Sequence, residues 1–331
     1  MKILFVSSGN SKGGISSIII NQAKSLTEEN CDVDFFAIKG KGVWGYLKNV
    51  LPLRKLIKIK KYDIIHAHYS MSGFVAALAG ANSLIVSLMG SDVKSEPFFK
   101  IFILIFNMLS WNQIIVKSED MKKTLALKNI RVIPNGVDFK KFKPIKKSIA
   151  LAYTKWDLSK KHILFGGNHH QKVKNFNLAK KAFDLLDYSK INLHYLENIP
   201  NDKMAFYHNS ADLILLTSLW EGSPNIIKEA MACNIPIVSS NVGDVYKLIE
   251  KTKGCYITSY NPKDIASKIN KALIFEKRTT GRIDINYLRS DFVAKKIINL
   301  IRGNINVNSN CFKISGANSI RSKSSTIATL T

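Results

Sequence analysis

A short loop rich in glycine, serine and proline follows an apolar run in the second half of the chain. Residues 212–217 are predicted as a buried strand, and a helix begins near Pro224, a residue type that suits the first turn of a helix. The backbone N–H groups of Ser223, Asn225 and Ile226 would have no partner within such a helix. They therefore predict an anion site, of the kind that binds a phosphate group.

Two carboxylates flank this loop. Glu221 lies before the predicted helix and Glu229 about one turn inside it, so both can face a bound phosphate. Carboxylates do not bind phosphate, but they accept hydrogen bonds from hydroxyl groups, and this combination suits a sugar nucleotide. The structural alternative makes Glu221 a carboxylate favoured by the helix dipole and Glu229 a solvated surface residue.

The surrounding segments predict an α/β fold with parallel sheets. Short apolar runs alternate with helix-length segments, which indicates βαβ units. The predicted strands are 3–7, 33–38, 64–67, 84–88, 114–116 and 131–133 in the first half, and 163–166, 192–196, 213–217 and 236–239 in the second. Because ligands bind beyond the carboxyl ends of such strands, two facing halves would surround one cleft with their loops.

A break in this alternation predicts two domains. Residues 140–161 contain Pro144 and many lysines with little periodicity, which is typical of a linker. The predicted organisation is an N-terminal Rossmann-like domain at 1–145, a C-terminal Rossmann-like domain at 146–286, a helix at 287–303 that packs back towards the N-terminal domain, and a disordered Ser-, Asn- and Thr-rich tail at 304–331.

Charge, cysteine spacing and the length of the apolar stretches limit the classes of protein to which the chain can belong. The 331 residues include 49 Lys and Arg against 24 Asp and Glu, a formal charge of +25 that predicts an anionic partner. The four cysteines lie far apart, which argues against a disulfide framework or a zinc site. The N-terminus turns polar after six residues, and the apolar stretch 98–111 is too short to span a bilayer and is predicted as a buried helix. A cytoplasmic protein is expected.

Residues 39–61 concentrate positive charge in the first half. They hold eight basic and no acidic residues, interleaved with Trp44, Tyr46 and leucines. Such a stretch predicts peripheral contact with an anionic bilayer. The alternative is an ordinary helix that begins near Pro52 and keeps its lysines in solvent, and both interpretations can hold together.

Several segments, in the right order, resemble the family 4 glycosyltransferases, which are retaining enzymes with the two-domain GT-B fold. The matching segments are Glu221-x7-Glu229, Ile133-Pro-Asn-Gly-Val-Asp138 with Phe142 and Pro144, Gly13-Gly14, Ala230-Met-Ala232 and Pro236-Ile-Val238. The resemblance runs from residue 3 to about residue 300. It implies two Rossmann-like domains that face each other across a cleft.

The resemblance also implies roles for individual residues. Glu229 would bind the ribose hydroxyls of the nucleotide, and Glu221 would hold hydroxyls of the donor sugar. The N–H group of Gly14 and those of Ser223, Asn225 and Ile226 would bind the diphosphate.

Members of this family place an arginine and then a lysine after the first strand of the C-terminal domain. Lys174 matches the lysine, whereas Asn168 stands at the arginine position among the predicted nucleotide-binding residues. Lys172, His169 and His170 are candidates for the missing charge. A departing nucleoside diphosphate gains negative charge that a metal or fixed positive charge must stabilise.

No metal is expected here. The single Asp-x-Asp pair, Asp32 and Asp34, begins a strand predicted as core, so Lys174 is the first choice as the catalytic charge. The resemblance also favours a cleft position and a catalytic role for His68, while the alternative is a core histidine. Met89 stands where the family often has a histidine, so no role of that histidine transfers, and Asp92 is either an acceptor-side residue or a helix N-cap.

The predicted function is that of a retaining, metal-independent glycosyltransferase of the hexosyltransferase type. Its donor would be a UDP- or GDP-linked sugar, and its acceptor would be a saccharide or a lipid-linked saccharide. The expected role is in capsule, lipopolysaccharide or exopolysaccharide biosynthesis. The expected location is the cytoplasm or the inner face of the plasma membrane. A sugar-nucleotide epimerase of the same architecture is the alternative enzyme. A nucleic-acid-binding protein is the other alternative, but the basic residues are dispersed and no nucleic-acid-binding motif is found, so no nucleic-acid partner is expected.

Overall fold

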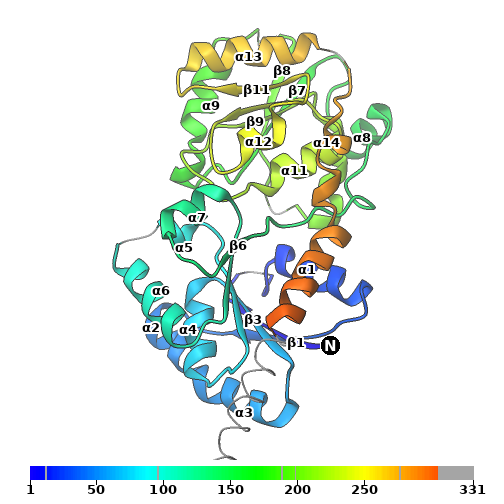
Figure 1. The fold of residues 1–331 in the computed structure, drawn as a ribbon. Coiled ribbons are helices and arrows are strands. Elements are labelled where there is room, and N and C mark those ends of the chain that lie inside the picture. The colour runs from blue at the N-terminus through cyan, green and yellow to red at the C-terminus, as the bar shows by residue number, and fades with distance from the viewer. Residues whose placement is uncertain (12, 95–96, 188, 198, 276, 305–331) are drawn as a thin grey trace, which may run out of the picture.

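Two parallel sheets, one in each half of the chain, form the framework of the protein (Figure 1). The structure is a computed structural model and describes residues 1–11, 13–94, 97–187, 189–197, 199–275 and 277–304. Helices cover both faces of each sheet. In the view of Figure 1 the C-terminal half lies above the N-terminal half, and each half has its own sheet. The expected pair of Rossmann-like halves is confirmed.

The N-terminal sheet has the strand order β2-β1-β3-β4-β5-β6, and all its neighbouring strands are parallel. Its strands are β1 (Lys2–Ser8), β2 (Asp32–Ile38), β3 (Ile64–His68), β4 (Leu84–Ser87), β5 (Gln113–Val116) and β6 (Ile130–Val132). The central strands are buried along both faces, which explains why they read as continuous apolar runs and not as alternating patterns.

The C-terminal sheet has the order β11-β10-β9-β7-β8, again all parallel. Its strands are β7 (Lys161–Phe165), β8 (Ile191–His194), β9 (Leu213–Leu216), β10 (Ile237–Ser240) and β11 (Cys255–Thr258). No strand is predicted from the sequence at the position of β11. This strand lies at the edge of the sheet and most of it is only half-buried, so its apolar signal is weak.

The helices follow the strands in the alternation that the sequence predicts. In the N-terminal half they are α1 (Ser17–Glu28), α2 (Gly42–Leu47), α3 (Val50–Lys60), α4 (Ser70–Leu78), α5 (Ser91–Lys94), α6 (Pro97–Leu109) and α7 (Glu119–Leu125). In the C-terminal half they are α8 (Lys147–Thr154), α9 (Phe176–Phe183), α10 (Met204–Ser210), α11 (Asn225–Ala232), α12 (Val245–Ile249), α13 (Pro262–Ile274) and α14 (Gly281–Asp284), with 3-10 turns η1 (Lys172–Lys174), η2 (Asn201–Lys203) and η3 (Asn286–Leu288).

Two segments differ from their sequence predictions. The segment predicted as a linker at 140–161 connects the two sheets and also contains α8, whose Ala150 and Leu151 are buried. The predicted buried helix at 98–111 is α6, and one of its faces is exposed to solvent: Met108 is 84% exposed and Leu109 78%. Sequence periodicity could not distinguish this case, since α6 is apolar on its outer face as well as its inner face.

The last helix, at residues 290–304, crosses back to the N-terminal half (Figure 1). Its side chains at 293, 294, 297, 298 and 301 form one apolar cluster with Ile3 and Phe5 of β1. The crossing lies beside the first connection between the halves, since the N–H of Val137 donates to Leu288 O (2.9 Å) and the N–H of Ser290 donates to Val137 O (3.0 Å). The two halves are therefore joined by two adjacent segments of chain.

The described helices are all too short or too polar to cross a bilayer. Apart from Asn304, the tail predicted at 304–331 lies outside the residues that the structure describes.

Candidate functional site

The strand order places ligand-binding loops where the two halves meet. In the C-terminal sheet, the chain passes from β7 to its neighbour β8 on one side, and from β9 to its neighbour β10 on the other side. The loops after β7 and β9 diverge at such a switch point and leave a crevice between them. Hydrogen bonds hold these loops together: the N–H of Leu219 donates to Val173 O (2.8 Å), and Thr217 Oγ1 donates to Lys174 O (3.1 Å) and to Asn175 O (3.0 Å).

A hollow of about 500 Å³, here called the large hollow, opens at this crevice. That volume suits a small-molecule ligand. Both halves of the protein contribute to its wall. The lining residues are Ile18, Met89, Lys117 and Asn135 from the N-terminal half, and Phe165, Gly166, Gly167, Asn168, Lys174, Leu196, Ile199, Met204, Glu221, Gly222, Ser223, Pro224, Asn225 and Ile226 from the C-terminal half.

Lys174 and Glu221 form an ion pair inside the large hollow. Lys174 Nζ lies 2.5 Å from Glu221 Oε1, which also accepts a hydrogen bond from Ser218 Oγ (2.7 Å). The Lys174 side chain lies across Gly167, where an added Cβ would come within 2.8 Å of Lys174 Cδ. The structure thus brings together the two side chains that the sequence singled out, and a Cβ at residue 167 would displace the stem of Lys174.

The start of α11 faces the same hollow. Ser223, Asn225 and Ile226 all line it, and no acceptor for their backbone N–H groups is found among the described residues. The side-chain Oδ1 of Asn225 is buried and has no hydrogen-bond partner in the described structure. The backbone N–H groups are donors that suit an anionic ligand at the helix start, whereas Asn225 Oδ1 is an acceptor that suits a hydroxyl group.

A buried lysine behind this helix start was missed by sequence reasoning. Lys228 is 1% exposed, and its Nζ donates to Asn135 O (3.0 Å) and to Ser223 Oγ (3.1 Å). Ser223 Oγ in turn donates to Asp244 Oδ2 (2.7 Å). Burial lowers the pKa of Lys228 to about 8. In the sequence, Lys228 stands directly after Ile227. In the structure, both side chains lie on the buried face of α11.

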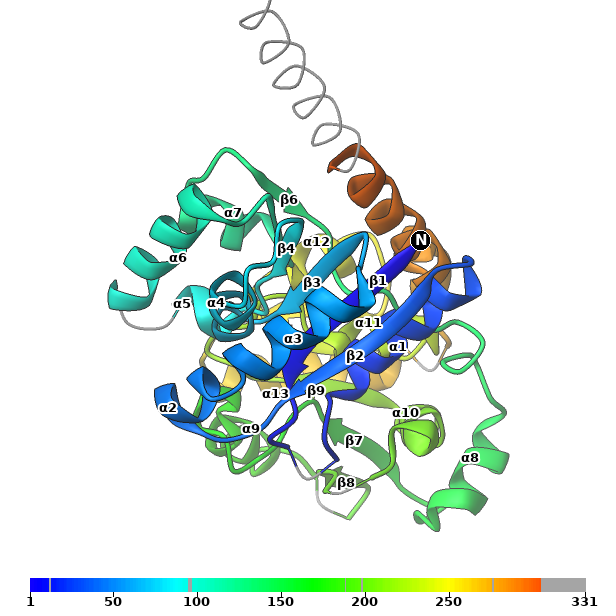
Figure 2. The same ribbon diagram turned by 90° about the horizontal axis from the view of Figure 1, so that it is seen from below.

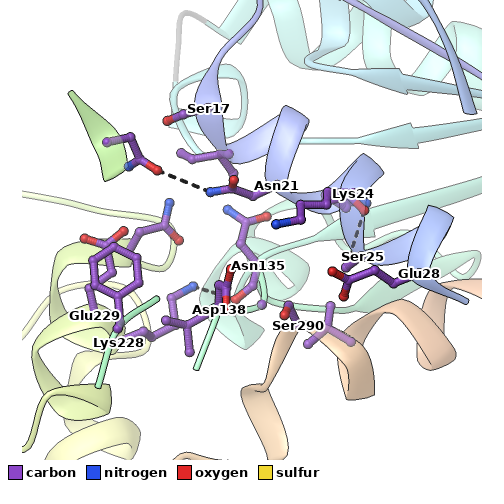
Figure 3. Close-up of a pocket in the computed structure, with 18 residues that line it drawn as sticks. Ser17, Asn21, Lys24, Ser25, Glu28, Asn135, Asp138, Lys228, Glu229 and Ser290 are labelled. Carbon is purple, nitrogen blue, oxygen red and sulfur yellow. Dashed lines mark hydrogen bonds between the residues drawn. The ribbon is translucent and has the colours of Figure 1, made fainter. Parts of the chain in front are cut away.

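Glu229 faces a second, smaller hollow of about 50 Å³ (Figure 3). Figure 3 shows Glu229 and Lys228 on one side of it and Asn21 and Lys24 of α1 on the other. The Glu229 carboxylate lies 3.2 Å from His208 Nε2. Asn135, Asn225 and Ile18 line both hollows, so the small hollow adjoins the large one. Glu221 and Glu229 therefore face neighbouring spaces on the two sides of the α11 start.

Two predicted site residues lie outside both hollows. The N–H of Gly14 donates to Ser11 O (2.9 Å) within its own turn, so this amide is not free for a phosphate. His68 is 1% exposed, with its ring 4.3 Å from that of His66 and 4.5 Å from that of Phe5. It does not line the cleft, because the central strand β3 is buried on both faces. Burial holds the pKa of His68 well below its usual value.

The candidates for the missing positive charge do not line the large hollow either. Asn168 lines it, and its Oδ1 accepts a hydrogen bond from the N–H of His170 (2.9 Å). His169 Nε2 and His170 Nε2 lie 3.2 and 3.1 Å from the same oxygen of Glu197. Lys172 is exposed to solvent.

One cluster among the described residues could share a metal ion. It consists of His169, His170 and Glu197, whose ligand atoms all lie within 4.8 Å of one another. The Asp-x-Asp pair offers no comparable site. Asp34 is engaged with Tyr62 (2.7 Å) and Lys60 (3.0 Å), and these hydrogen bonds lower its pKa.

Asp92 is buried and holds a loop of the N-terminal half in place. Its carboxylate accepts hydrogen bonds from the N–H groups of Ser70 (3.2 Å), Met89 (3.0 Å) and Gly90 (2.9 Å). Gly90 has φ +118°, and an added Cβ would lie 3.3 Å from the backbone N of Gly222. The loop fixed by Asp92 thus touches the loop that carries Glu221, and the two halves meet at backbone contact distance.

The site as a whole combines free amides, an ammonium group and carboxylates around one interdomain space. Amides and an ammonium stabilise an anion, while the carboxylates accept hydrogen bonds from hydroxyl groups. This arrangement can bind a phosphorylated molecule that also carries hydroxyls.

Comparison with protein families matches both halves of the chain. Residues 12–141 match the family described as Glycosyltransferase Family 4, and residues 189–280 match the family described as Glycosyl transferases group 1. Together the two segments cover more than half of the chain.

Two curated relatives are similar to the chain over most of its length. One is the UDP-Gal:alpha-D-GlcNAc-diphosphoundecaprenol alpha-1,3-galactosyltransferase of Escherichia coli, 27% identical over 68% of this chain and 69% of the relative. Another is the putative teichuronic acid biosynthesis glycosyltransferase TuaC of Bacillus subtilis, 25% identical over 63% of this chain and 61% of the relative.

Solved structures share the fold at low sequence identity. Sucrose-phosphate synthase from Thermosynechococcus elongatus superposes with a TM-score of 0.78 at 16% identity, covering 92% of this chain and 98% of that chain. Anabaena HepE, solved in complex with UDP and glucose, superposes with a TM-score of 0.73 at 15% identity, covering 92% and 100%. The two facing Rossmann-like halves are therefore those of the GT-B fold.

Proposed function

We propose, from the premise that this chain belongs to the family 4 glycosyltransferases, that it transfers a sugar from a nucleoside-diphosphate donor to a hydroxyl group of a saccharide acceptor. The observation that carries the proposal is the Lys174–Glu221 pair beside the free amides at the start of α11, in an interdomain hollow of about 500 Å³. The donor binds mainly to the C-terminal half, and the acceptor approaches from the N-terminal half.

Each group in the site has a task in this reaction. The amides at Ser223, Asn225 and Ile226 and the Lys174 ammonium hold the diphosphate and stabilise the charge that develops as it leaves. Glu229 accepts hydrogen bonds from the ribose hydroxyls. Glu221 is held towards the hollow by Ser218 and accepts hydrogen bonds from the donor sugar.

We propose that the reaction proceeds with retention and without a metal. The bond between the anomeric carbon and the phosphate oxygen breaks, and its electron pair leaves with the diphosphate. The acceptor oxygen forms the new bond on the same face of the sugar, and its proton passes to the departing phosphate oxygen. The support for this proposal is the family membership together with fixed positive charge at the diphosphate position.

The relatives support a particular class of substrates. The Escherichia coli relative is named as an enzyme that transfers galactose from a UDP donor to a lipid-diphosphate-linked sugar, and the Bacillus subtilis relative is named for teichuronic acid biosynthesis. HepE was solved with UDP and with UDP-glucose. We therefore propose a UDP-linked donor, a lipid-linked saccharide acceptor and a role in the assembly of a surface polysaccharide or glycolipid.

Donor binding is the first measurement. The purified protein is screened by thermal shift against UDP-, GDP- and ADP-linked sugars, and a UDP-sugar is expected to raise the melting temperature most. Transfer to saccharide acceptors is then followed with that donor, with and without EDTA. Unchanged transfer in EDTA is expected, while strong inhibition would contradict metal independence and direct attention to His169, His170 and Glu197. Turnover of the donor to an isomer without any acceptor would indicate an epimerase.

A membrane-facing surface is the second part of the proposal. Helices α2 and α6 both pack against α4 and lie on the same side of the N-terminal half (Figures 1 and 2). Their exposed apolar side chains, here called the apolar side, are Val43, Trp44, Leu47, Ile101, Leu104, Ile105, Met108 and Leu109. The eight basic residues of 39–61 come from α3 and from the segments that flank α2 and α3. Exposed apolar side chains beside basic ones suit an anionic bilayer and a lipid-linked acceptor.

Sedimentation with lipid vesicles tests this surface. The wild type is expected to bind vesicles that contain phosphatidylglycerol and to bind pure phosphatidylcholine vesicles much more weakly. Trp44→Asp combined with Met108→Asp is expected to lower binding to the anionic vesicles at least tenfold, because both side chains are exposed on the apolar side. Ile274→Asp is the matched control, since Ile274 is 78% exposed on the C-terminal half. Equal loss in the control would contradict the assignment.

A further inference from the structure

The wall that the C-terminal half gives to the large hollow carries little free positive charge. Its lysine, Lys174, is already paired with Glu221 at 2.5 Å. Asn168, which also lines the hollow, is neutral. The remaining charge must come from a side chain that lines the same space, and the sequence alone did not identify one.

Lys117 lines this space from the opposite side. It follows β5 directly, in the N-terminal half, and shares the wall of the hollow with Gly222 and Ser223 of the C-terminal half. Lys117 is only 3% exposed to solvent. Among the residues that the structure describes, its ammonium makes no hydrogen bond or ion pair. A buried ammonium without a partner is costly, so a group of opposite charge is expected to occupy the hollow in the working enzyme.

The charged and titratable groups around Lys117 do not supply that partner. Asp92 is the acidic group that acts on it, and its oxygens are already engaged by three backbone N–H groups. Lys228, from α11, repels it, and His66 and His68 from β3 are kept neutral by burial. Burial and Lys228 lower the pKa of Lys117 to about 7. The ammonium therefore titrates near neutral pH while the hollow is empty.

We propose that Lys117 supplies, from the N-terminal half, the positive charge that binds the diphosphate of the donor opposite the amides at the start of α11. This inference rests on the proposed function. It assigns to the acceptor-side domain a residue that contacts the donor, so the diphosphate is held between the two halves of the protein. Binding of the anion then stabilises the protonated lysine and the contact between the loops at Gly90 and Gly222.

Titration calorimetry of the whole enzyme tests this role. UDP, GDP and ADP are compared first, and the diphosphate that binds the wild type most tightly is used for the variants at pH 7. Lys117→Met is expected to lower its affinity about tenfold to a hundredfold, in line with the loss of a hydrogen bond to a charged group. Binding of the corresponding nucleoside, measured by competition, is expected to stay unchanged.

Two controls separate this effect from damage to the fold. Lys122→Met removes the same charge from an exposed position in α7 and is expected to leave binding unchanged. Lys117→Met itself is expected to unfold at the same temperature as the wild type or a higher one, because it removes a buried charge and keeps the length of the side chain. Diphosphate affinity of the wild type is expected to fall between pH 7 and pH 8.5, as Lys117 loses its proton, and this fall is expected to be smaller in the variant.

The outcomes are distinguishable. Equal diphosphate affinity in the wild type and Lys117→Met would overturn the inference and leave the proposed function intact. Normal donor binding with lost transfer to a diphosphate-linked acceptor would also overturn it, since Lys117 would then serve the acceptor. A wild type that binds none of the three diphosphates would contradict the proposed function itself.

Discussion

Lys174→Met is expected to lower the rate of sugar transfer about a hundredfold to a thousandfold, which is the typical loss when a preorganised donor to developing negative charge is removed. Lys174 lies in the large hollow with its stem across Gly167, so its ammonium is placed before the donor binds. The loss is expected mainly in kcat, because the charge on the diphosphate is greatest when its bond to the sugar is breaking. Initial rates with saturating donor and acceptor measure it.

The matched control for this variant lies in the same short helix. Lys172→Met removes an equal charge from η1 at an exposed position and is expected to transfer sugar at the wild-type rate. A second comparison uses Glu221→Gln, which leaves Lys174 without its ion-pair partner. If Lys174→Met retained more than a tenth of the wild-type rate, the diphosphate would not depend on this ammonium, and the assignment would be wrong.

Glu229→Ala is expected to lower the affinity for the donor about tenfold to a hundredfold, since it removes a charged acceptor of the ribose hydroxyls. The wild type should discriminate between a ribonucleotide and its 2′-deoxy analogue, and the variant should bind the two nearly alike. Calorimetry with both nucleotides gives this difference directly.

Glu250→Ala, at an exposed position of the C-terminal half, is the control for that comparison. Glu229 also lies 3.2 Å from His208, so the melting temperature of Glu229→Ala has to be recorded beside its affinity. Persistence of the discrimination against the 2′-deoxy nucleotide in a folded Glu229→Ala would show that the ribose lies elsewhere.

Local patterns in the sequence predicted most of the framework and one wall of the site. The loop from Glu221 to Ile226 was identified because its chemistry is local: a strand, a glycine, a proline and a helix start follow one another. Lys174 was identified through the resemblance, and the structure places it against Glu221 because the loops after β7 and β9 are hydrogen-bonded together.

The remaining wall depends on contacts that no local pattern encodes. Lys117 follows a four-residue strand and reads as an ordinary charged residue, yet the approach of the two halves encloses it in the hollow. His68 was expected in the cleft but lies in the core, because the side on which a strand's last residue points depends on the packing of both faces. Gly14 was expected to offer an amide that its own turn already uses.

The return of the last helix has a consequence for how the protein is made. The apolar cluster beneath β1 includes side chains from residues 293–301, so residues 1–145 alone do not contain all of the core of their own domain. During synthesis, the N-terminal half must wait for almost the whole described chain to leave the ribosome before that side of its sheet is covered. The separated halves are therefore unsuited to independent expression, and a truncation shortly before residue 290 would damage the N-terminal domain.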